Sequence, residues 1–269
     1  MSSLAHIRAV ALDFDGTLLE MDGSICSEAR AAILAAAAAG VRVATASGRS
    51  LAQQIDFLAA GSLGVAARVP HALTVDERSV WLLDGHGYEP LTAWNDRVDA
   101  EWARLHPVAV AVGRDIVAEL RARGVDVAPS MDPESVARRG QFGLRFRGEA
   151  EALAHRAWLA EFVAAHSDEL VVSQNWMLVH ILPRAAGKGH TLAALARAWQ
   201  LAPSEMLAVG DRHNDVPMLD GALGLGAACV GNAVDDIKAL VRGVGGYVAT
   251  ADTGAGVAEI LEKVLADRA

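Results

Sequence analysis

Two aspartates near the N-terminus, Asp13 and Asp15, have the types and spacing to do chemistry. They belong to the run Asp13-Phe14-Asp15-Gly16-Thr17-Leu18, which follows the mainly apolar segment Ile7–Leu12. That segment predicts a buried strand that ends at a glycine turn, and ligands of open α/β sheets bind at the carboxyl ends of strands. Two crowded carboxylates repel each other at neutral pH, so they need a shared proton or a cation. With a divalent metal both could stay ionised, and one could act as a nucleophile. An Asp-rich turn that caps the next element is the structural alternative.

Two further segments could bind an anion. A second predicted strand, Val41–Ala46, leads into Ser47-Gly48-Arg49, where a hydroxyl and backbone N–H groups at a helix start could hold a phosphate oxygen. Gly187-Lys188-Gly189 places a cation at another helix start. The lysine is not part of a P-loop, because the pattern G-x-x-x-x-G-K-[ST] is missing. The alternatives are an N-cap serine and an ordinary surface lysine.

A second acidic pair, Asp211 and Asp215, lies in Gly210-Asp211-Arg212-His213-Asn214-Asp215 after the predicted strand Met206–Gly210. Carboxylate oxygens at a strand end are the ligands that hard divalent cations prefer. The alternative is a turn with an Asp N-cap.

The elements that position these residues alternate between strand and helix at both ends of the chain. Predicted strands lie at 7–12, 41–46, 69–75, 206–210, 227–230 and 247–249, and predicted helices at 28–39, 50–58, 188–200, 216–220, 233–242 and 256–266. This alternation indicates a parallel sheet with crossover helices.

The middle of the chain differs in pattern and composition. Its predicted strands are Val80–Leu83, Gln141–Phe146 and Leu178–Leu182, its predicted helices are Asp115–Arg123 and Glu149–His166, and it holds five of the six tryptophans. We therefore predict a discontinuous core, residues 1–78 and 184–269, interrupted by an α+β domain at residues 79–183.

Composition limits the setting in which the protein works. The 269 residues fit one or two domains, and 52% apolar residues allow a sizeable core. A net charge of −9 argues against a nucleic-acid or anionic membrane surface. Cys26 and Cys229 form no C-x-x-C pair, which suits a reducing cytoplasm, and no leader or long apolar stretch is evident. We expect a cytoplasmic monomer or homodimer without a nucleic-acid or membrane partner.

Taken in order, the acid pair, hydroxyl, lysine and second acid pair resemble the four motifs of the haloacid dehalogenase (HAD) superfamily of phosphotransferases. They match at Asp13-Phe14-Asp15-Gly16-Thr17, Ser47, Lys188 and Gly210–Asp215. The insertion lies between the second and third motifs, where the C2 cap of the Cof-type branch (subclass IIB) sits. The resemblance implies a Rossmann-like parallel-sheet HAD core with an inserted α+β C2-type cap domain.

The resemblance also implies the roles of the acidic residues. Asp13 would be the nucleophile that forms an aspartyl-phosphate. Asp15 would be the general acid and then the base. Asp13, the backbone carbonyl of Asp15 and Asp211 would hold Mg²⁺. Asp215 would support the metal through water or orient Lys188.

The same resemblance implies that the other motif residues bind the phosphate. Ser47 would hold a phosphate oxygen, with Gly48 beside it, and Lys188 would neutralise charge and help position Asp13. Asn214 is a further candidate for the phosphate site. Cof-type members commonly carry Asn-Gly-Ala where the third strand enters the cap, whereas this chain reads Thr74-Val75-Asp76-Glu77-Arg78-Ser79. This wall of the phosphate site therefore departs from the family pattern.

The resemblance implies a Mg²⁺-dependent phosphomonoester hydrolase that acts on a small phosphorylated metabolite, with a sugar phosphate as the expected substrate. A phosphomutase would use the same chemistry but would require slow hydrolysis of the aspartyl-phosphate. A receiver-like signalling module also combines acids, a hydroxyl and a lysine, but it is far shorter and lacks the Asp-x-Asp pair. A non-catalytic phosphate-binding protein is the remaining alternative.

Overall fold

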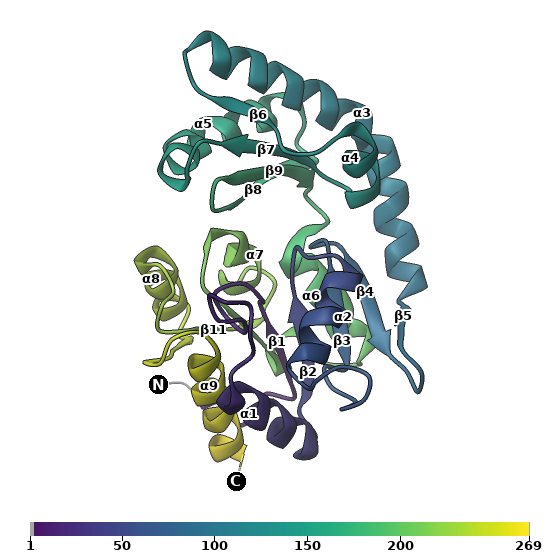
Figure 1. Cartoon of the computed structure of the whole chain (residues 1–269), viewed down its shortest axis with the longest axis vertical. Coiled ribbons are helices and arrows are strands. Elements are labelled where there is room, and N and C mark those ends of the chain that lie inside the picture. Colours follow the sequence, from purple (N-terminus) through teal and green to yellow (C-terminus); the bar gives the residue numbers. More distant parts are fainter. Residues whose placement is uncertain (1–2, 269) are drawn as a thin grey trace. The chain divides into compact units, whose positions relative to one another are not determined.

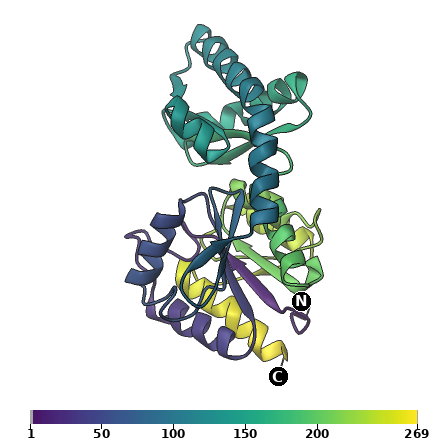
Figure 2. The same cartoon turned by 90° about the vertical axis from the view of Figure 1, so that its right-hand side faces the viewer.

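The computed structural model describes residues 3–268, which divide into two compact units (Figures 1 and 2). The larger unit contains the chain up to Trp94 and from Lys188 onward, and the smaller unit is Asn95–Gly187. Among the described residues, no helix combines the length and the apolar character that crossing a membrane requires.

The larger unit is built on one mixed sheet. Its strands are β1 (Ala9–Leu12), β2 (Arg42–Ala46), β3 (Ala72–Val75), β4 (Ser79–Leu83), β5 (Tyr88–Pro90), β10 (Met206–Gly210), β11 (Gly226–Cys229) and β12 (Tyr247–Val248). They are ordered β12-β11-β10-β1-β2-β3-β4-β5. The strands from β12 to β3 pair in parallel, whereas β4 and β5 pair antiparallel. The chain proceeds from β1 to β2 on one side and places β10 on the other, so β1 lies at the topological switch point.

Helices cover the parallel part of this sheet. They are α1 (Ser27–Ala38), α2 (Leu51–Ala60), α6 (Gly187–Ala198), α7 (Val216–Leu219), α8 (Asp235–Gly243) and α9 (Thr253–Arg268), with short 3-10 turns η1 (Pro203–Glu205) and η2 (His213–Asp215). Figure 2 shows α1 and α9 side by side on one face of the sheet. Val10 and Leu12 of β1 join the core under α1 and α9, and the alternating Ala9 and Ala11 are also fully buried. Burial on both faces explains why β1 reads as a continuous apolar run.

The smaller unit packs helices against a four-stranded antiparallel sheet. The strands β6 (Val127–Pro129), β7 (Phe142–Phe146), β8 (Leu170–Asn175) and β9 (Leu178–Pro183) are ordered β6-β7-β9-β8. The helices are α3 (Thr92–Ala122), α4 (Pro133–Arg139) and α5 (Glu149–His166). Residues of α3, α5, β7 and β9 share one hydrophobic core, so this unit has an α+β arrangement.

The long helix α3 differs from the predicted Asp115–Arg123, because it begins at Thr92 and contains Pro107. A proline normally breaks a helix interior because it removes one hydrogen bond and crowds the preceding turn. Here a buried stripe at helical spacing holds the helix across that position. The stripe consists of Trp94, Val98, Trp102, Leu105, Ala109, Val112, Ile116 and Leu120.

The division of the chain also differs from the expected 79–183. Strands β4 and β5 extend the larger sheet, and the Tyr88 hydroxyl donates to the Pro70 carbonyl at 2.9 Å. Trp81 and Trp94 therefore belong to the larger unit, although the sequence analysis counted them among the tryptophans of the middle domain. The smaller unit ends at Gly187 rather than at Pro183.

Gly113 provides a test of packing in the smaller unit. An added Cβ would collide with the Phe142 ring across the α3–β7 contact. Alanine favours helix by about 1 kcal/mol, but overpacking a core costs roughly 1–3 kcal/mol. We expect Gly113→Ala to lower the thermal unfolding midpoint. Gly243→Ala, at a helical position with no heavy atom within 4 Å, is the control and should not lower it. A Gly113→Ala protein as stable as wild type would contradict this packing.

Candidate active site

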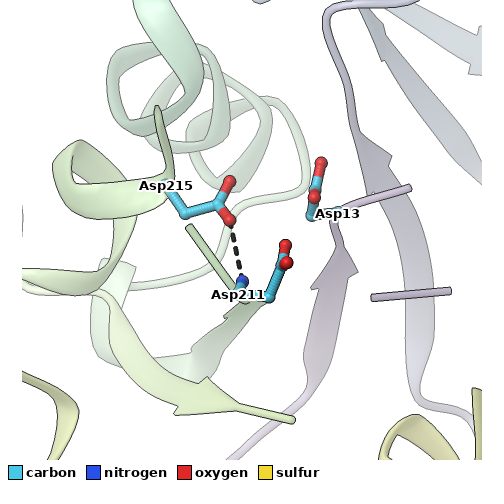
Figure 3. Close-up of side chains that lie close together, drawn as sticks. All are labelled: Asp13, Asp211 and Asp215. Carbon is cyan, nitrogen blue, oxygen red and sulfur yellow. Dashed lines mark hydrogen bonds between the residues drawn. The ribbon is translucent and has the colours of Figure 1, made fainter. Parts of the chain in front are cut away.

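The sequence motifs meet at one edge of the larger sheet. Asp13 follows β1, Ser47 follows β2 and Asp211 follows β10, and these three strands are parallel neighbours. Their carboxyl ends therefore lie at the same edge. Figure 3 shows the side chains of Asp13, Asp211 and Asp215 close together there.

Lys188 connects two of these carboxylates. Its Nζ donates to Oδ1 of Asp13 at 2.5 Å and to Oδ1 of Asp215 at 2.6 Å. The lysine is 1% exposed, so it is not the ordinary surface lysine of the alternative interpretation. It can lie this deep because α6 packs closely at its first turn, where an added Cβ at Gly189 would collide with the Pro217 carbonyl.

Asp215 also organises the turn that follows β10. Its Oδ2 accepts hydrogen bonds from the backbone N–H of Asp211 at 2.9 Å, the dashed line in Figure 3, and from that of Arg212 at 3.1 Å. Gly210 is required beside it, because an added Cβ would collide with the Asp215 carboxylate. Asp215 thus braces the loop that carries Asp211 and at the same time contacts Lys188.

Asp211 also contacts the turn after β1, through Thr17 and Gly16. The Thr17 hydroxyl donates to Asp211 Oδ1 at 3.2 Å. Gly16 adopts φ +79°, and an added Cβ would lie 2.6 Å from Asp211 Oδ2. The Gly-Thr pair of the first motif therefore allows the second acidic motif to approach and fixes its orientation.

Burial changes the proton affinity of this cluster. Desolvation, with the nearby charge of Asp215, raises the pKa of Asp13 well above its usual value despite the opposing charge of Lys188. Desolvation and Asp215 likewise raise the pKa of Asp211 to about 7. Burial by itself would lower the pKa of Lys188, but the charges of Asp13, Asp215 and Glu77 outweigh it and raise that pKa above its ordinary value. Lys188 therefore stays protonated, while the carboxylates require further positive charge.

The cluster fits a divalent cation. Asp13, Asp211 and Asp215 each offer one carboxylate oxygen, and these oxygens lie within 4.8 Å of one another. An all-oxygen donor set suits a hard cation such as Mg²⁺ rather than a thiophilic metal. Arg212 also pairs with Asp211, with its Nε 3.5 Å from Oδ2, but the three carboxylates still outnumber Lys188 and Arg212, the two cations that contact them.

Asp15 lies beside this cluster and is paired with Arg49, a residue that the sequence analysis did not single out. Arg49 Nη2 donates to Asp15 Oδ1 at 2.5 Å, and Arg49 Nε donates to Asp15 Oδ2 at 2.9 Å. The guanidinium also lies over the Phe57 ring, 4.5 Å from its centroid. Arg49 ends the run Ser47-Gly48-Arg49, so its place next to the predicted hydroxyl was the signal available in the sequence.

The predicted phosphate-binding residues lie near these groups. Ser47 is 1% exposed, and its hydroxyl accepts a hydrogen bond from the Arg49 backbone N–H at 3.1 Å. Ser47 is not an N-cap, because Ser50 caps α2 with a capping box to Gln53. Asn214 is 5% exposed and donates from Nδ2 to Glu77 Oε1 at 3.2 Å.

Comparison with known proteins gives the family. The model of the sucrose-6F-phosphate phosphohydrolase family matches residues 7–263. The chain belongs to this family, within the HAD superfamily. The predicted superfamily and fold class are confirmed, and the protein is a HAD-type phosphatase.

Curated relatives match this chain either at low identity over its whole length or at higher identity over about a third of it. A phosphoglycolate phosphatase from Methanothermobacter thermautotrophicus is 24% identical over 96% of this chain and 99% of that protein. Another, from Methanoculleus marisnigri, is 35% identical, but the match covers only 36% of this chain and 39% of that protein.

Solved structures share the fold. The sucrose-phosphatase of Synechocystis sp., determined in complex with sucrose and phosphate, has a TM-score of 0.69 at 17% identity and covers 96% of this chain and 98% of that chain. A haloacid dehalogenase-like hydrolase from B. subtilis has a TM-score of 0.64 at 16% identity and covers 95% and 99%.

The raised pKa of Asp211 predicts a pH-dependent metal site. A carboxyl whose pKa is about 7 in the folded protein, against an ordinary value of 3.8, stabilises the metal-free fold at low pH. That contribution is lost progressively as the pH rises from about 4 to about 7, by up to about 1.4 kcal/mol per pH unit, and little more is lost above pH 7. We expect thermal unfolding in EDTA to show this loss, and added Mg²⁺ to stabilise the protein more as Asp211 ionises.

Asp211→Asn isolates the effect, because the amide has nearly the same shape and does not titrate. Compared with wild type, this variant should show a weaker pH dependence of the Mg²⁺ stabilisation, with the remainder coming from Asp13, whose pKa is also raised. If it retains the wild-type response to Mg²⁺ across the same pH range, Asp211 does not bind the metal.

Proposed function

We propose that this protein is a Mg²⁺-dependent phosphomonoester hydrolase that acts on a small phosphorylated metabolite, a sugar phosphate, through an aspartyl-phosphate on Asp13. The observation that carries the proposal is the buried contact of Lys188 with Asp13 and Asp215, with Asp211 beside them at the carboxyl edge of the sheet. Family membership supports the same chemistry.

Asp13 has the surroundings that a carboxylate nucleophile needs. It is 5% exposed, so few water molecules compete with the substrate, and Lys188 fixes one of its oxygens. A carboxylate oxygen of Asp13 would attack phosphorus while the bond from phosphorus to the leaving oxygen breaks. The lysine keeps the attacking group oriented and lowers the negative charge that the phosphate encounters.

Asp15 would move the protons in both half-reactions. It would donate a proton to the leaving alkoxide in the first, and it would take a proton from the water that attacks the aspartyl-phosphate in the second. Its side chain is 42% exposed, which suits exchange of a proton with solvent, and Arg49 holds its orientation. Attack by the water breaks the bond between phosphorus and the Asp13 oxygen, which restores the carboxylate and frees phosphate.

Mg²⁺ fits this site through the oxygens of Asp13 and Asp211, with the Asp15 carbonyl as a further predicted ligand and Asp215 supporting the arrangement. When bound, the ion would offset the repulsion between anionic Asp13 and an anionic phosphate, which reaches about 4 kcal/mol per pair of unit charges 4 Å apart at an effective dielectric of about 20. Ser47, Gly48, Lys188 and Asn214 would contact the phosphate oxygens.

The sugar-phosphate proposal is supported by the names of similar proteins. The matching family is described by sucrose-6F-phosphate hydrolysis, and the Synechocystis structure contains sucrose and phosphate. Several curated relatives are named phosphoglycolate phosphatases, so 2-phosphoglycolate is the main competing substrate.

Two free cysteines are compatible with a cytoplasmic setting.

Phosphate release across a substrate panel tests this proposal. The panel contains sucrose 6-phosphate, hexose phosphates, 2-phosphoglycolate, nucleotides and pyridoxal phosphate, each with Mg²⁺ and with EDTA. We expect metal-dependent release that is greatest for a sugar phosphate and is abolished in Asp13→Asn. Full activity in Asp13→Asn would refute the nucleophile, and preference for 2-phosphoglycolate would refute the sugar-phosphate assignment.

Arg49 is expected to affect turnover through Asp15. Arg49→Ala removes the bidentate contact, and a misplaced proton donor can lower kcat by about tenfold to a hundredfold. Arg49→Lys should rescue little, because a lysine cannot form the same planar pair or stack on Phe57. Steady-state kinetics checks both variants.

Arg8→Ala is the matched control for Arg49, because Arg8 is 60% exposed in its ion pair with Glu205. Exposed pairs contribute about 0–1 kcal/mol to stability, so this variant should keep the wild-type kcat. An Arg49→Ala enzyme that turns over like the Arg8→Ala enzyme would exclude a role for the Arg49–Asp15 pair.

A further inference from the structure

The turn between β3 and β4 has an unusual backbone for the residues it contains. Asp76 and Glu77 adopt φ +51° and +57°, in the left-handed region. Glycine occupies such positions without steric cost, whereas other residues are strained there by about 1–2 kcal/mol. Asp76 and Glu77 lie in the segment Thr74–Ser79, where the Asn-Gly-Ala common in Cof-type members is missing, and the backbone of Glu77 is one that glycine would adopt without strain. Strain of this kind persists where surrounding contacts hold it.

Glu77 contacts three segments that carry motif residues. Its backbone N–H donates to the Ser47 carbonyl at 3.0 Å. Its carbonyl accepts from the Thr191 hydroxyl on α6 at 3.1 Å, one turn beyond Lys188. Its carboxylate Oε1 accepts from Asn214 Nδ2 at 3.2 Å. One residue therefore joins the loop after β2, the start of α6 and the turn η2.

The side chain of Glu77 is part of the site rather than of the surface. It is 4% exposed, and its charge is among those that raise the pKa of Lys188. An added Cβ at Gly48 would lie 3.5 Å from Glu77 Oε1, so the carboxylate lies against the Ser47–Gly48 turn. A buried negative charge beside a phosphate site opposes anion binding. The Glu77 carboxylate must therefore contribute something that offsets this cost, and the contacts it makes indicate that it positions neighbouring groups.

The contact with Asn214 fixes the orientation of that amide. A carboxylate only accepts hydrogen bonds, so the NH₂ group of Asn214 must face Glu77 and its carbonyl oxygen must face away. The NH₂ group has two hydrogens, and the second remains for a phosphate oxygen. A charged acceptor makes the contact stronger than one between neutral groups.

We propose that Glu77 is a positioning residue of the active site, whose carboxylate holds the Asn214 amide and packs against the Ser47–Gly48 turn, so that both keep the geometry that phosphoryl transfer requires. The inference rests on the proposed function. It means that Glu77 forms the wall of the phosphate site in the segment where the family's Asn-Gly is missing.

Three variants test it, measured with the best substrate of the wild-type enzyme. Glu77→Gly removes the carboxylate and suits the left-handed backbone. Glu77→Gln keeps an oxygen that can accept from Asn214. Asp76→Gly relieves the same kind of strain at the neighbouring position (φ +51°) and leaves Glu77 in place.

We expect Glu77→Gly to lower kcat by about tenfold or more, as loss of a supporting contact does in other sites, without lowering the thermal unfolding midpoint. Glu77→Gln should recover most of that kcat, and Asp76→Gly should keep it. Two results would overturn the proposal: a Glu77→Gly enzyme with wild-type kcat, or a Glu77→Gln enzyme as slow as Glu77→Gly.

Failure of the proposed function gives a different result. In that case wild type itself releases no phosphate with Mg²⁺ from any member of the panel. Crystal structures of wild type and Glu77→Gly then decide the inference without activity. Displacement of Asn214 and of the Ser47–Gly48 turn in the variant would support the positioning role, and an unchanged site would exclude it.

Discussion

The site depends on one buried ammonium group. Lys188 has no exposed side-chain surface, and transferring an unpaired charge into such a place costs several kcal/mol. Its contacts with Asp13 and Asp215 repay that cost only if the end of β1, the start of α6 and the turn η2 are brought together accurately. The same two contacts explain why the carboxylates of Asp13 and Asp215 tolerate burial, since without Lys188 neither would have a positive charge beside it. Folding of the larger unit and assembly of the site are therefore one process.

Close backbone approach is the second constraint. Gly16, Gly189 and Gly210 each lie where an added Cβ would meet a carboxylate or a carbonyl of a neighbouring segment. Only a residue without a side chain lets the motif loops pack this tightly. The glycines of the motifs thus set the distances between charged groups, and the aspartates and the lysine supply the charge. Both are needed for a cation site of this size.

Around this centre, polar contacts hold the remaining functional side chains in place. Arg49 pairs with Asp15 and stacks on Phe57, and Glu77 joins the Asn214 amide to the neighbouring loops. The comparisons establish the fold and the class of reaction, and they agree with the buried centre. These outer contacts orient the groups that would bind the phosphate and move the protons.

The sequence by itself determined the order and local setting of the motifs. Short apolar runs that end in polar residues located Asp13, Ser47 and Asp211 at strand ends, and the strand–helix alternation determined the α/β class. These signals depend on near neighbours, which is why they could be read directly. The family resemblance implied that Lys188 meets Asp13 across 175 residues, whereas tertiary structure alone decided that Arg49 pairs with Asp15 and Glu77 with Asn214. Tertiary structure also carried α3 through Pro107 and placed β4 and β5 in the larger sheet, because burial against remote partners outweighed the local preference of those segments.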